Sequence, residues 1–203
     1  MLNHMMQNYT VMLLSCISAY LIGSIPFGML IARKQGIDIR TVGSGNIGAT
    51  NIARNLGWKT GALVGVLDFT KSFVPALVAR TLFARTGLVL LVSLMPVLGH
   101  LFPIWLQFKG GKGVATIFGI LGAYFGLLYF LGFLAIWLFA VKKIRLMSLV
   151  NLAAALLFPL AFWLKFEAWI FVLFGLLLCS IIWVSHRANI KRLLAGEENL
   201  IKL

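Results

Sequence analysis

Long apolar runs alternate with short basic clusters along almost the whole chain. Most runs reach about 18 residues or more, the length that a helix needs to cross a membrane with a hydrocarbon core of about 30 Å. The pattern therefore predicts an all-α, polytopic membrane helical bundle. The expected spans cover residues 9–31, 60–83, 88–108, 114–140, 147–164 and 168–185.

The basic residues predict how this bundle is oriented, because Lys and Arg collect in the cytoplasmic segments of membrane proteins. With the segments 33–59, 109–113, 142–145 and the tail after 185 inside, cytoplasmic segments hold 14 of the 18 Lys and Arg residues. The outer segments then hold three, and Lys71 lies within a span. We expect the N-terminus outside and the C-terminus in the cytoplasm.

The run 114–140 decides the number of spans. As one helix its 27 residues would extend about 40 Å, more than one span requires. The basic cluster at 142–145 favours the side that also holds Lys112, so the chain should cross twice, in two short helices that bend near Gly122 or Gly126. This gives seven transmembrane helices in a single domain over residues 1–203. A single tilted span, with six in total and an external tail, is the alternative.

Composition supports a membrane protein. The chain is 61% hydrophobic and 11% charged, whereas soluble domains carry about 25% charge. The net charge of +13 reflects the cytoplasmic loops, so no nucleic-acid partner is expected. Cys16 and Cys179 lie in apolar runs, where buried thiols are expected to be packing groups and not a disulfide, a metal site or a nucleophile. The first run is followed by basic residues without a small-residue cleavage site, which predicts a retained span.

The most informative polar stretch, residues 43–51, reads GSGNIGATN and is followed by Arg54. Its glycines permit positive φ, so successive amides could converge on an anion at the start of a helix near Ala49. These residues predict a phosphate-binding loop. The spacing of the glycines also matches the dinucleotide fingerprint, with Asp68 20 residues after Gly48, but that motif needs a βαβ unit, which this composition does not provide.

Two further polar clusters fall on the expected cytoplasmic face. Residues 109–113 read KGGKG just before an expected helix start; this is not a Walker loop, because glycine follows Lys112 where Ser or Thr would hold magnesium. Residues 186–192 read HRANIKR, with His186 and Asn189 on one helix face. Each cluster alone could attract anionic lipid. Two glycine loops with basic partners on one face favour a phosphate site.

Other polar residues have structural interpretations. Asp68 and Lys71 are spaced to form an ion pair within a span, where unpaired charge is costly. His100 is expected to be a hydrogen-bonded structural histidine, and Ser148 is either a helix cap or a ligand. With five acidic residues, no two-aspartate metal site is available, and no metal or other cofactor is expected.

Together, the glycine motif, the stretch from Gly99-His100 to Thr116, and the His186-Arg187-x-Asn189 motif resemble the bacterial acyl-phosphate:glycerol-3-phosphate acyltransferases. The resemblance covers essentially the whole chain, in length, span number and motif order. Ile47 is a mild departure at a position where proline or valine is expected. The resemblance implies an enzyme of the bacterial inner membrane, active at the cytoplasmic face, with a role in phospholipid biosynthesis.

The family implies that the chain transfers a fatty acyl group from acyl phosphate to glycerol 3-phosphate, giving 1-acylglycerol 3-phosphate (lysophosphatidic acid) and phosphate. The enzyme that forms acyl phosphate is a candidate partner, besides membrane lipid. The implied catalytic residues are Ser44, Arg54, Lys112, His186 and Asn189. Expected phosphate-binding residues are Gly43, Gly45, Asn46, Gly48, Asn51, Lys109, Gly111, Gly113 and Ser148.

This chemistry suits the residues, because acyl phosphate is already activated and needs positioning and charge stabilisation more than a strong nucleophile. We expect direct attack by a glycerol hydroxyl, with either His186 or a substrate phosphate oxygen as the base. A membrane transporter of a phosphorylated solute is the alternative function, since basic pockets and glycine-broken helices suit it as well. Polar clusters confined to one face and the lack of an internal repeat argue against it.

Overall fold

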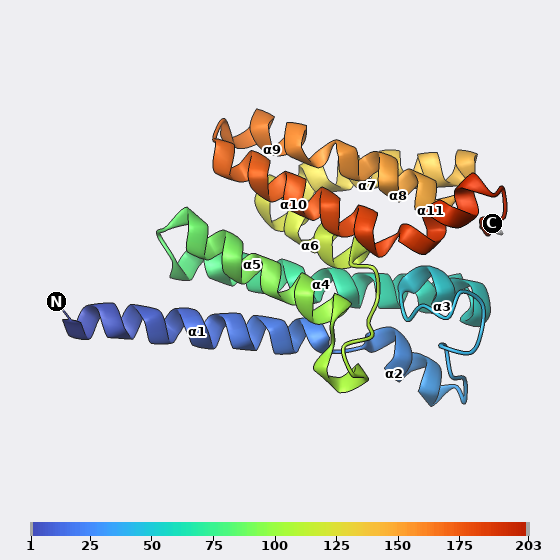
Figure 1. Ribbon diagram of the computed structural model, residues 1–203, viewed down its shortest axis with the longest axis horizontal. Helices are drawn as coiled ribbons and strands as arrows, with labels where there is room; N and C mark the ends of the chain where they lie inside the picture. Colours follow the sequence, from blue (N-terminus) through green and yellow to red (C-terminus); the bar gives the residue numbers. More distant parts are fainter. Residues whose placement is uncertain (1, 202–203) are drawn as a thin grey trace. The chain divides into compact units, whose positions relative to one another are not determined.

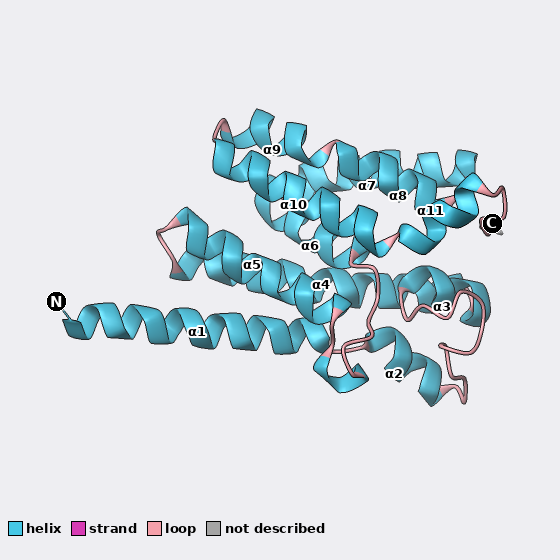
Figure 2. Cartoon of the chain, viewed as in Figure 1, coloured by secondary structure: helices cyan, strands magenta, loops and turns pink. Residues whose placement is uncertain are grey.

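The structure, a computed structural model, describes residues 2–201, and these form helices joined by loops, without a strand (Figures 1 and 2). The expected all-α class is confirmed. The chain divides into two compact units, the first ending at Tyr124 and the second beginning at Phe125. The predicted position of the N-terminus concerns residue 1, which lies outside the described residues.

The first unit contains α1 (Leu2–Ser24), α2 (Phe27–Lys34), α3 (Ala49–Leu56), α4 (Trp58–Leu82), α5 (Thr86–Leu101), a 3₁₀ turn (Ile104–Leu106) and α6 (Val114–Phe125). Helix α1 packs on α5 over close backbone contacts: a Cβ at Gly23 would overlap Pro96, and one at Gly99 would overlap the Tyr20 carbonyl. Small residues at such crossings let membrane helices approach closely. This contact fixes the end of α5, where the second glycine loop begins.

The expected span over 9–31 is present as one candidate span, Tyr9–Lys34, but its helix breaks between α1 and α2. Pro26 cannot donate the backbone hydrogen bond that a continuous helix needs at this position. The carbonyl of Ile25 instead accepts a hydrogen bond from Lys71 Nζ at 2.9 Å. The expected span over 88–108 likewise corresponds to one candidate span, Thr86–Leu106, in which α5 ends at Leu101 because Phe102 precedes Pro103 and is disfavoured from helical geometry.

The break predicted in the 114–140 run lies at Gly126, whose φ of +88° is a value that favours glycine. On its N-terminal side, α6 has 12 residues. The Arg80 guanidinium lies over the Tyr124 ring and donates a hydrogen bond to the Ala123 carbonyl. This bond gives a partner to one of the carbonyls that the end of α6 leaves without a partner inside the helix. On the other side, α7 (Leu127–Ile144) has 18 residues, more than the short helix expected there.

The second unit contains α7, α8 (Met147–Leu156), α9 (Phe158–Phe166), α10 (Trp169–Ser185) and α11 (Arg187–Leu194). The expected span over 147–164 corresponds to one candidate span, Met147–Phe166, whose helix is interrupted at Leu157, shortly before Pro159 in the first turn of α9. Five segments of the described chain are long and apolar enough to cross a membrane, and a sixth is added if α10 and α11, bent by 62°, count together. The shorter α6 lies outside this set.

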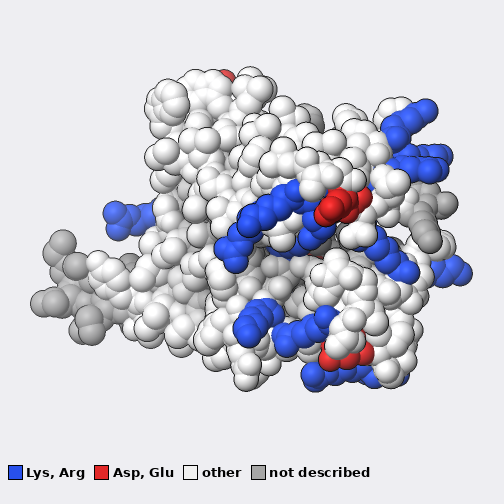
Figure 3. Space-filling view, turned by 45° about the vertical axis from the view of Figure 1, so that its right-hand side comes forward, with Lys and Arg blue, Asp and Glu red and all other residues white. Residues whose placement is uncertain are grey.

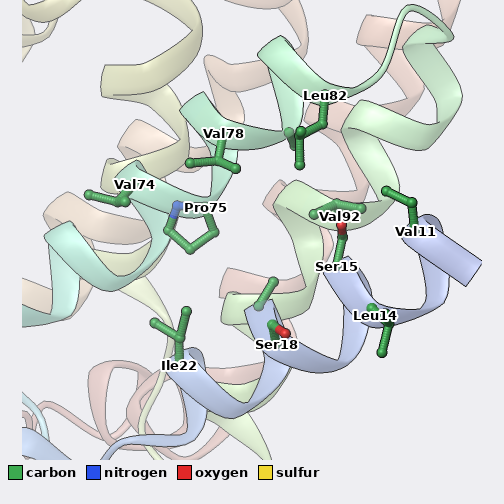
Figure 4. A pocket seen from close by; sticks show the side chains of 12 residues that line it. Val11, Leu14, Ser15, Ser18, Ile22, Val74, Pro75, Val78, Leu82 and Val92 are labelled. Atoms are coloured by element: carbon green, nitrogen blue, oxygen red, sulfur yellow. The ribbon is translucent and has the colours of Figure 1, made fainter.

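One hollow of the first unit lies between α1, α4 and α5 (Figure 4). It is lined by apolar side chains of α1 and α4, among them Val11, Ile22, Val74 and Val78, and Ser15 and Ser18 are the polar residues of the lining. Its lining carries no charged side chain. The hollow therefore suits hydrocarbon, and the phosphate chemistry has to be sought at the loops.

Candidate functional site

The first glycine loop connects α2 to α3 and is built around the buried side chain of Asn51. Asn51 Oδ1 accepts a hydrogen bond from the Ser44 amide at 2.9 Å, and its Nδ2 donates to the carbonyls of Ile39 and Val42 at 3.2 and 3.1 Å. Gly43 has a φ of +59°, and a Cβ there would overlap the Asn51 side chain. Asn51 is 2% exposed and therefore shapes the loop from inside.

The loop uses several of the amides that were expected to bind an anion. The Ser44 amide donates to Asn51 Oδ1, the Gly45 amide to the Val42 carbonyl at 3.0 Å, and the Gly48 amide to Asn46 Oδ1 at 2.8 Å. These three amides thus have partners within the loop, and the expected role of this stretch in binding phosphate stays a prediction. Ser44 itself is exposed, so its hydroxyl remains accessible.

Helix α3 begins at Ala49, as expected, with Gly48 as its N-cap. Among the described residues, no side chain caps this end, so the first amides of α3 present the positive end of the helix. Arg54 lies in the last turn of α3, where it is half-buried and its Nε is shielded from solvent.

The second glycine loop runs from the end of α5 to the start of α6 at Val114, as predicted. The amides of Gly110 and Gly111 donate to the carbonyls of Leu101 and His100, each at 3.0 Å. Gly113 has a φ of +81°, and its carbonyl accepts from the Thr116 hydroxyl at 2.9 Å and from the Ile117 amide at 2.8 Å. These bonds fix the backbone on both sides of Lys112, which is half-buried, whereas Lys109 is exposed.

The two glycine loops lie side by side in the first unit. Arg40, in the first loop, donates from Nη2 to the Lys109 carbonyl in the second loop at 3.2 Å. The expectation that these loops share one face is thereby confirmed. Ser44 lies in the first loop, Lys112 in the second, and Arg54 in α3, which follows the first loop. On the face that Figure 3 shows, Lys and Arg cover more of the surface than Asp and Glu.

The expected ion pair within the span is also present. Lys71 Nζ lies 2.8 Å from Asp68 Oδ1, and both side chains are 3% exposed. His100 Nδ1 lies 2.9 Å from the same ammonium, so this histidine is hydrogen-bonded within the fold, as predicted. Pairing of this kind makes charge inside a membrane tolerable.

In the second unit, His186 and Asn189 lie at the bend between α10 and α11. Both are buried, at 2% and 5% exposure. His186 Nδ1 lies 2.8 Å from the Ile182 carbonyl, which can only accept a hydrogen bond. Nδ1 therefore carries a proton, and in the neutral ring Nε2 is the acceptor nitrogen.

Sequence reasoning missed the role of Glu198, which lies in the tail after α11. Its Oε1 accepts from Asn189 Nδ2 at 2.7 Å, and its Oε2 pairs with Arg192 Nε at 2.8 Å. Partial burial alone would raise the pKa of Glu198. The hydrogen bonds from Asn189 and Arg192 and the charge of Arg192, with a smaller contribution from Ser148, nevertheless hold this pKa below its ordinary value.

Ser148 joins this cluster through α8, which contacts α11. It is not the N-cap of α8, because the helix begins at Met147 after Leu146. Ser148 is 3% exposed. Among the described residues, no group of three or more His, Cys, Asp or Glu side chains is arranged to hold a metal ion.

Replacing Glu198 with glutamine should loosen the tail. The variant keeps the shape but loses the charge that Asn189 and Arg192 bind, which costs about 1–2 kcal/mol of local stability. Because the folded-state pKa is depressed, the stabilisation is present above the ordinary pKa of glutamate and is lost as pH falls through the folded value. Faster amide exchange over residues 186–201 would report it. Glu197→Gln, at the exposed neighbouring residue, is the control. Equal exchange in both variants would contradict a role of Glu198 in holding the tail.

Comparison with known proteins finds one family over most of the chain. A family model described as glycerol-3-phosphate acyltransferase matches residues 13–196. A glycerol-3-phosphate acyltransferase of Geotalea daltonii is 42% identical over 92% of this chain and 95% of the relative. That of Aquifex aeolicus is 45% identical over 90% of this chain and 95% of its own length.

Comparison with solved structures finds proteins of the same activity. The crystal structure of PlsY (YgiH), an integral membrane glycerol 3-phosphate acyltransferase, in its glycerol 3-phosphate form has a TM-score of 0.87 and 39% identity, covering 95% of this chain and 96% of that chain. Its lysophosphatidic acid form gives 0.85 and 38%, with the same coverage. The fold and the comparisons thus define a multi-pass, all-helical membrane acyltransferase. The chain belongs to the glycerol-3-phosphate acyltransferase family, which confirms the resemblance found in the sequence at this level.

Proposed function

We propose that the protein transfers a fatty acyl group from acyl phosphate to glycerol 3-phosphate, releasing 1-acylglycerol 3-phosphate (lysophosphatidic acid) and inorganic phosphate. The observation that carries this proposal is the bond from Arg40 to the Lys109 carbonyl, which joins two glycine loops with basic side chains. Two neighbouring loops of this kind suit a reaction in which both substrates carry phosphate. Membership in a family of enzymes favours this reaction over transport of a phosphorylated solute.

In this proposal the first unit binds phosphate. Lys112 and Arg54 hold phosphate oxygens by charge-assisted hydrogen bonds, and the Ser44 hydroxyl donates to the oxyanion that develops on the acyl carbonyl. Asn51 and Asn46 act by shaping the first loop around Ser44. In the same proposal, Gly43, Gly45 and Gly48 give the first loop its shape, Gly111 and Gly113 shape the second, and Lys109 adds positive charge beside the bound phosphates.

The reaction then requires one bond to form and one to break. The glycerol hydroxyl oxygen attacks the acyl carbon, the bond between that carbon and the phosphate oxygen breaks, and phosphate leaves with the electron pair. His186 takes the hydroxyl proton on Nε2, and Asn189 and Ser148 contribute hydrogen bonds to substrate phosphate. We propose that both units act as one transmembrane domain in this reaction, without a metal or other cofactor.

The activity is tested with purified protein in lipid nanodiscs. Phosphate should be released only when acyl phosphate and glycerol 3-phosphate are both present, with lysophosphatidic acid formed in equal amount. Acyl-CoA and acyl carrier protein should not replace acyl phosphate. Phosphate release from acyl phosphate alone, at the same rate, would refute the transfer reaction.

Replacing Ser44 with alanine separates direct transfer from an acyl-serine intermediate. Loss of one oxyanion donor should lower kcat by about 100- to 1,000-fold, while wild-type protein incubated with acyl phosphate alone should gain no acyl adduct by mass spectrometry. Thr41→Ala is a matched control, because Thr41 is an exposed hydroxyl residue of the same loop that donates to the Asp38 carbonyl. An adduct on Ser44 would overturn direct attack.

We further propose seven spans, an external N-terminus, and an active site facing the cytoplasm of the bacterial inner membrane, where an acyl-phosphate-forming enzyme could deliver its product. The glycine loops and the tail after residue 186 are then cytoplasmic. Single-cysteine labelling in spheroplasts tests this orientation after Cys16 and Cys179 are replaced. Ala195→Cys should react only after permeabilisation; its labelling in intact spheroplasts would support the six-span alternative with an external tail.

A further inference from the structure

The buried ion pair Asp68–Lys71 is connected to the second glycine loop through His100. The Lys71 ammonium has three partners: it forms an ion pair with Asp68 Oδ1 at 2.8 Å and hydrogen bonds with His100 Nδ1 and the Ile25 carbonyl, each at 2.9 Å. Lys71 thus joins α4 to the break between α1 and α2 and to the last turn of α5. A buried network of an ion pair and hydrogen bonds holds the groups that it joins in place.

Beyond this network, His100 contacts the loop that carries Lys112 in two ways. Its carbonyl accepts the Gly111 amide at 3.0 Å. Its ring edge faces Gly111 so closely that a Cβ at Gly111 would overlap Nε2 of the imidazole. The position of the imidazole, which Lys71 fixes through Nδ1, therefore sets how near the loop backbone can lie to α5.

We propose that His100, held by Asp68 and Lys71, is a positioning residue that fixes the 109–113 loop and thereby directs Lys112. This inference rests on the proposed role of Lys112 in binding substrate phosphate. It gives the charged pair within the span a function beyond packing, since the pair anchors a loop outside its own helix. A misplacement of about 1 Å in such a site costs about 100-fold in rate.

A double-mutant cycle between His100 and Gly111 tests the contact. Gly111→Ala should lower kcat/KM for the phosphate substrates by about 100-fold, because the new Cβ pushes the loop away from the imidazole. In His100→Ala/Gly111→Ala the space of the ring is vacant, so activity should recover by about tenfold or more over Gly111→Ala alone. Gly87→Ala, in the same helix α5 and with open space around the added Cβ, is the control.

A second variant separates loss of the contact with Gly111 from loss of the folded structure. His100→Asn keeps an acceptor for Lys71 near the position of Nδ1 but removes the ring edge that faces Gly111. It should retain the melting temperature of the wild type and still suppress Gly111→Ala. Losses that multiply in both double variants would overturn the proposal, because multiplication is the behaviour of two residues that act independently.

Amide exchange tests the loop without any substrate. In His100→Ala the amides of Gly110 and Gly111 should exchange faster than in wild type, whereas those of α4 should be unchanged. Unchanged exchange at Gly110 and Gly111 would overturn positioning by His100. A wild-type protein without two-substrate phosphate release would instead refute the proposed function, and the exchange result would still decide whether His100 holds the loop.

Discussion

Replacing Lys112 with methionine should lower the rate of acyl transfer by about 30- to 1,000-fold, or about 2–4 kcal/mol of transition-state stabilisation. The loss follows from the loop: Lys112 lies between Gly111, which is pressed against the His100 ring, and Gly113, whose φ is +81°. The backbone is held there by four hydrogen bonds that do not involve the lysine side chain, two from glycine amides and two to the Gly113 carbonyl. Methionine therefore removes the cation while the loop keeps its shape.

Arginine at this position should fail as well. It keeps the positive charge but presents a wider, planar group in place of a compact ammonium, and the fixed loop cannot move back to make room. Lys59→Met and Lys59→Arg are matched controls, because Lys59 is exposed at the start of α4 in the same unit, and both should stay within about threefold of wild type. A Lys112→Arg enzyme with near wild-type kcat/KM would show that only charge matters.

Local signals in the sequence were sufficient to predict the starts of two helices that follow the glycine loops. Helix α3 begins at Ala49 and α6 at Val114, each directly after a glycine. The spacing of Asp68 and Lys71 was enough to predict their ion pair, because two opposite charges three residues apart in a span have few other partners. The helix break in the 114–140 run was predicted from excess length and the need to satisfy the basic cluster after it.

Long-range contacts explain what the sequence did not reveal. Arg40 bonds to Lys109, 69 positions away, and Lys71 reaches the carbonyl of Ile25, 46 positions away. Neither partner has a local pattern that identifies the other. The break between α1 and α2 did have a signal, Pro26, but the apolar run around it concealed the interruption.

The glycines of the first loop illustrate a second limit. A Gly-x-Gly-x-x-Gly spacing indicates a backbone that turns tightly, but not which acceptors its amides will find. Here Asn46 in the loop and Asn51 in the first turn of α3 supply two of those acceptors. Glu198 was overlooked for a related reason: an acidic residue in a polar tail resembles a solvated surface residue until the chain folds back onto Asn189 and Arg192.

Replacing His186 with asparagine should remove the acid limb of the pH–rate profile together with about 100- to 10,000-fold of kcat, the range expected for loss of a general base. The hydrogen bond between Nδ1 and the Ile182 carbonyl fixes the tautomer, so Nε2 is the nitrogen that accepts the proton. As pH falls, the imidazole becomes protonated and can no longer act as a base, which produces the acid limb. Steady-state rates between about pH 5 and 9 measure it.

Ser185→Ala is the matched control for this prediction. The Ser185 hydroxyl lies 3.3 Å from His186 Nδ1, but the bond to Ile182 remains when it is removed, so rate and profile should change by less than about threefold. An active His186→Asn enzyme that keeps the same acid limb would contradict the prediction. Because a phosphate monoester loses its second proton near pH 6, that result would make a phosphate oxygen of the substrate the base and leave His186 with a binding role alone.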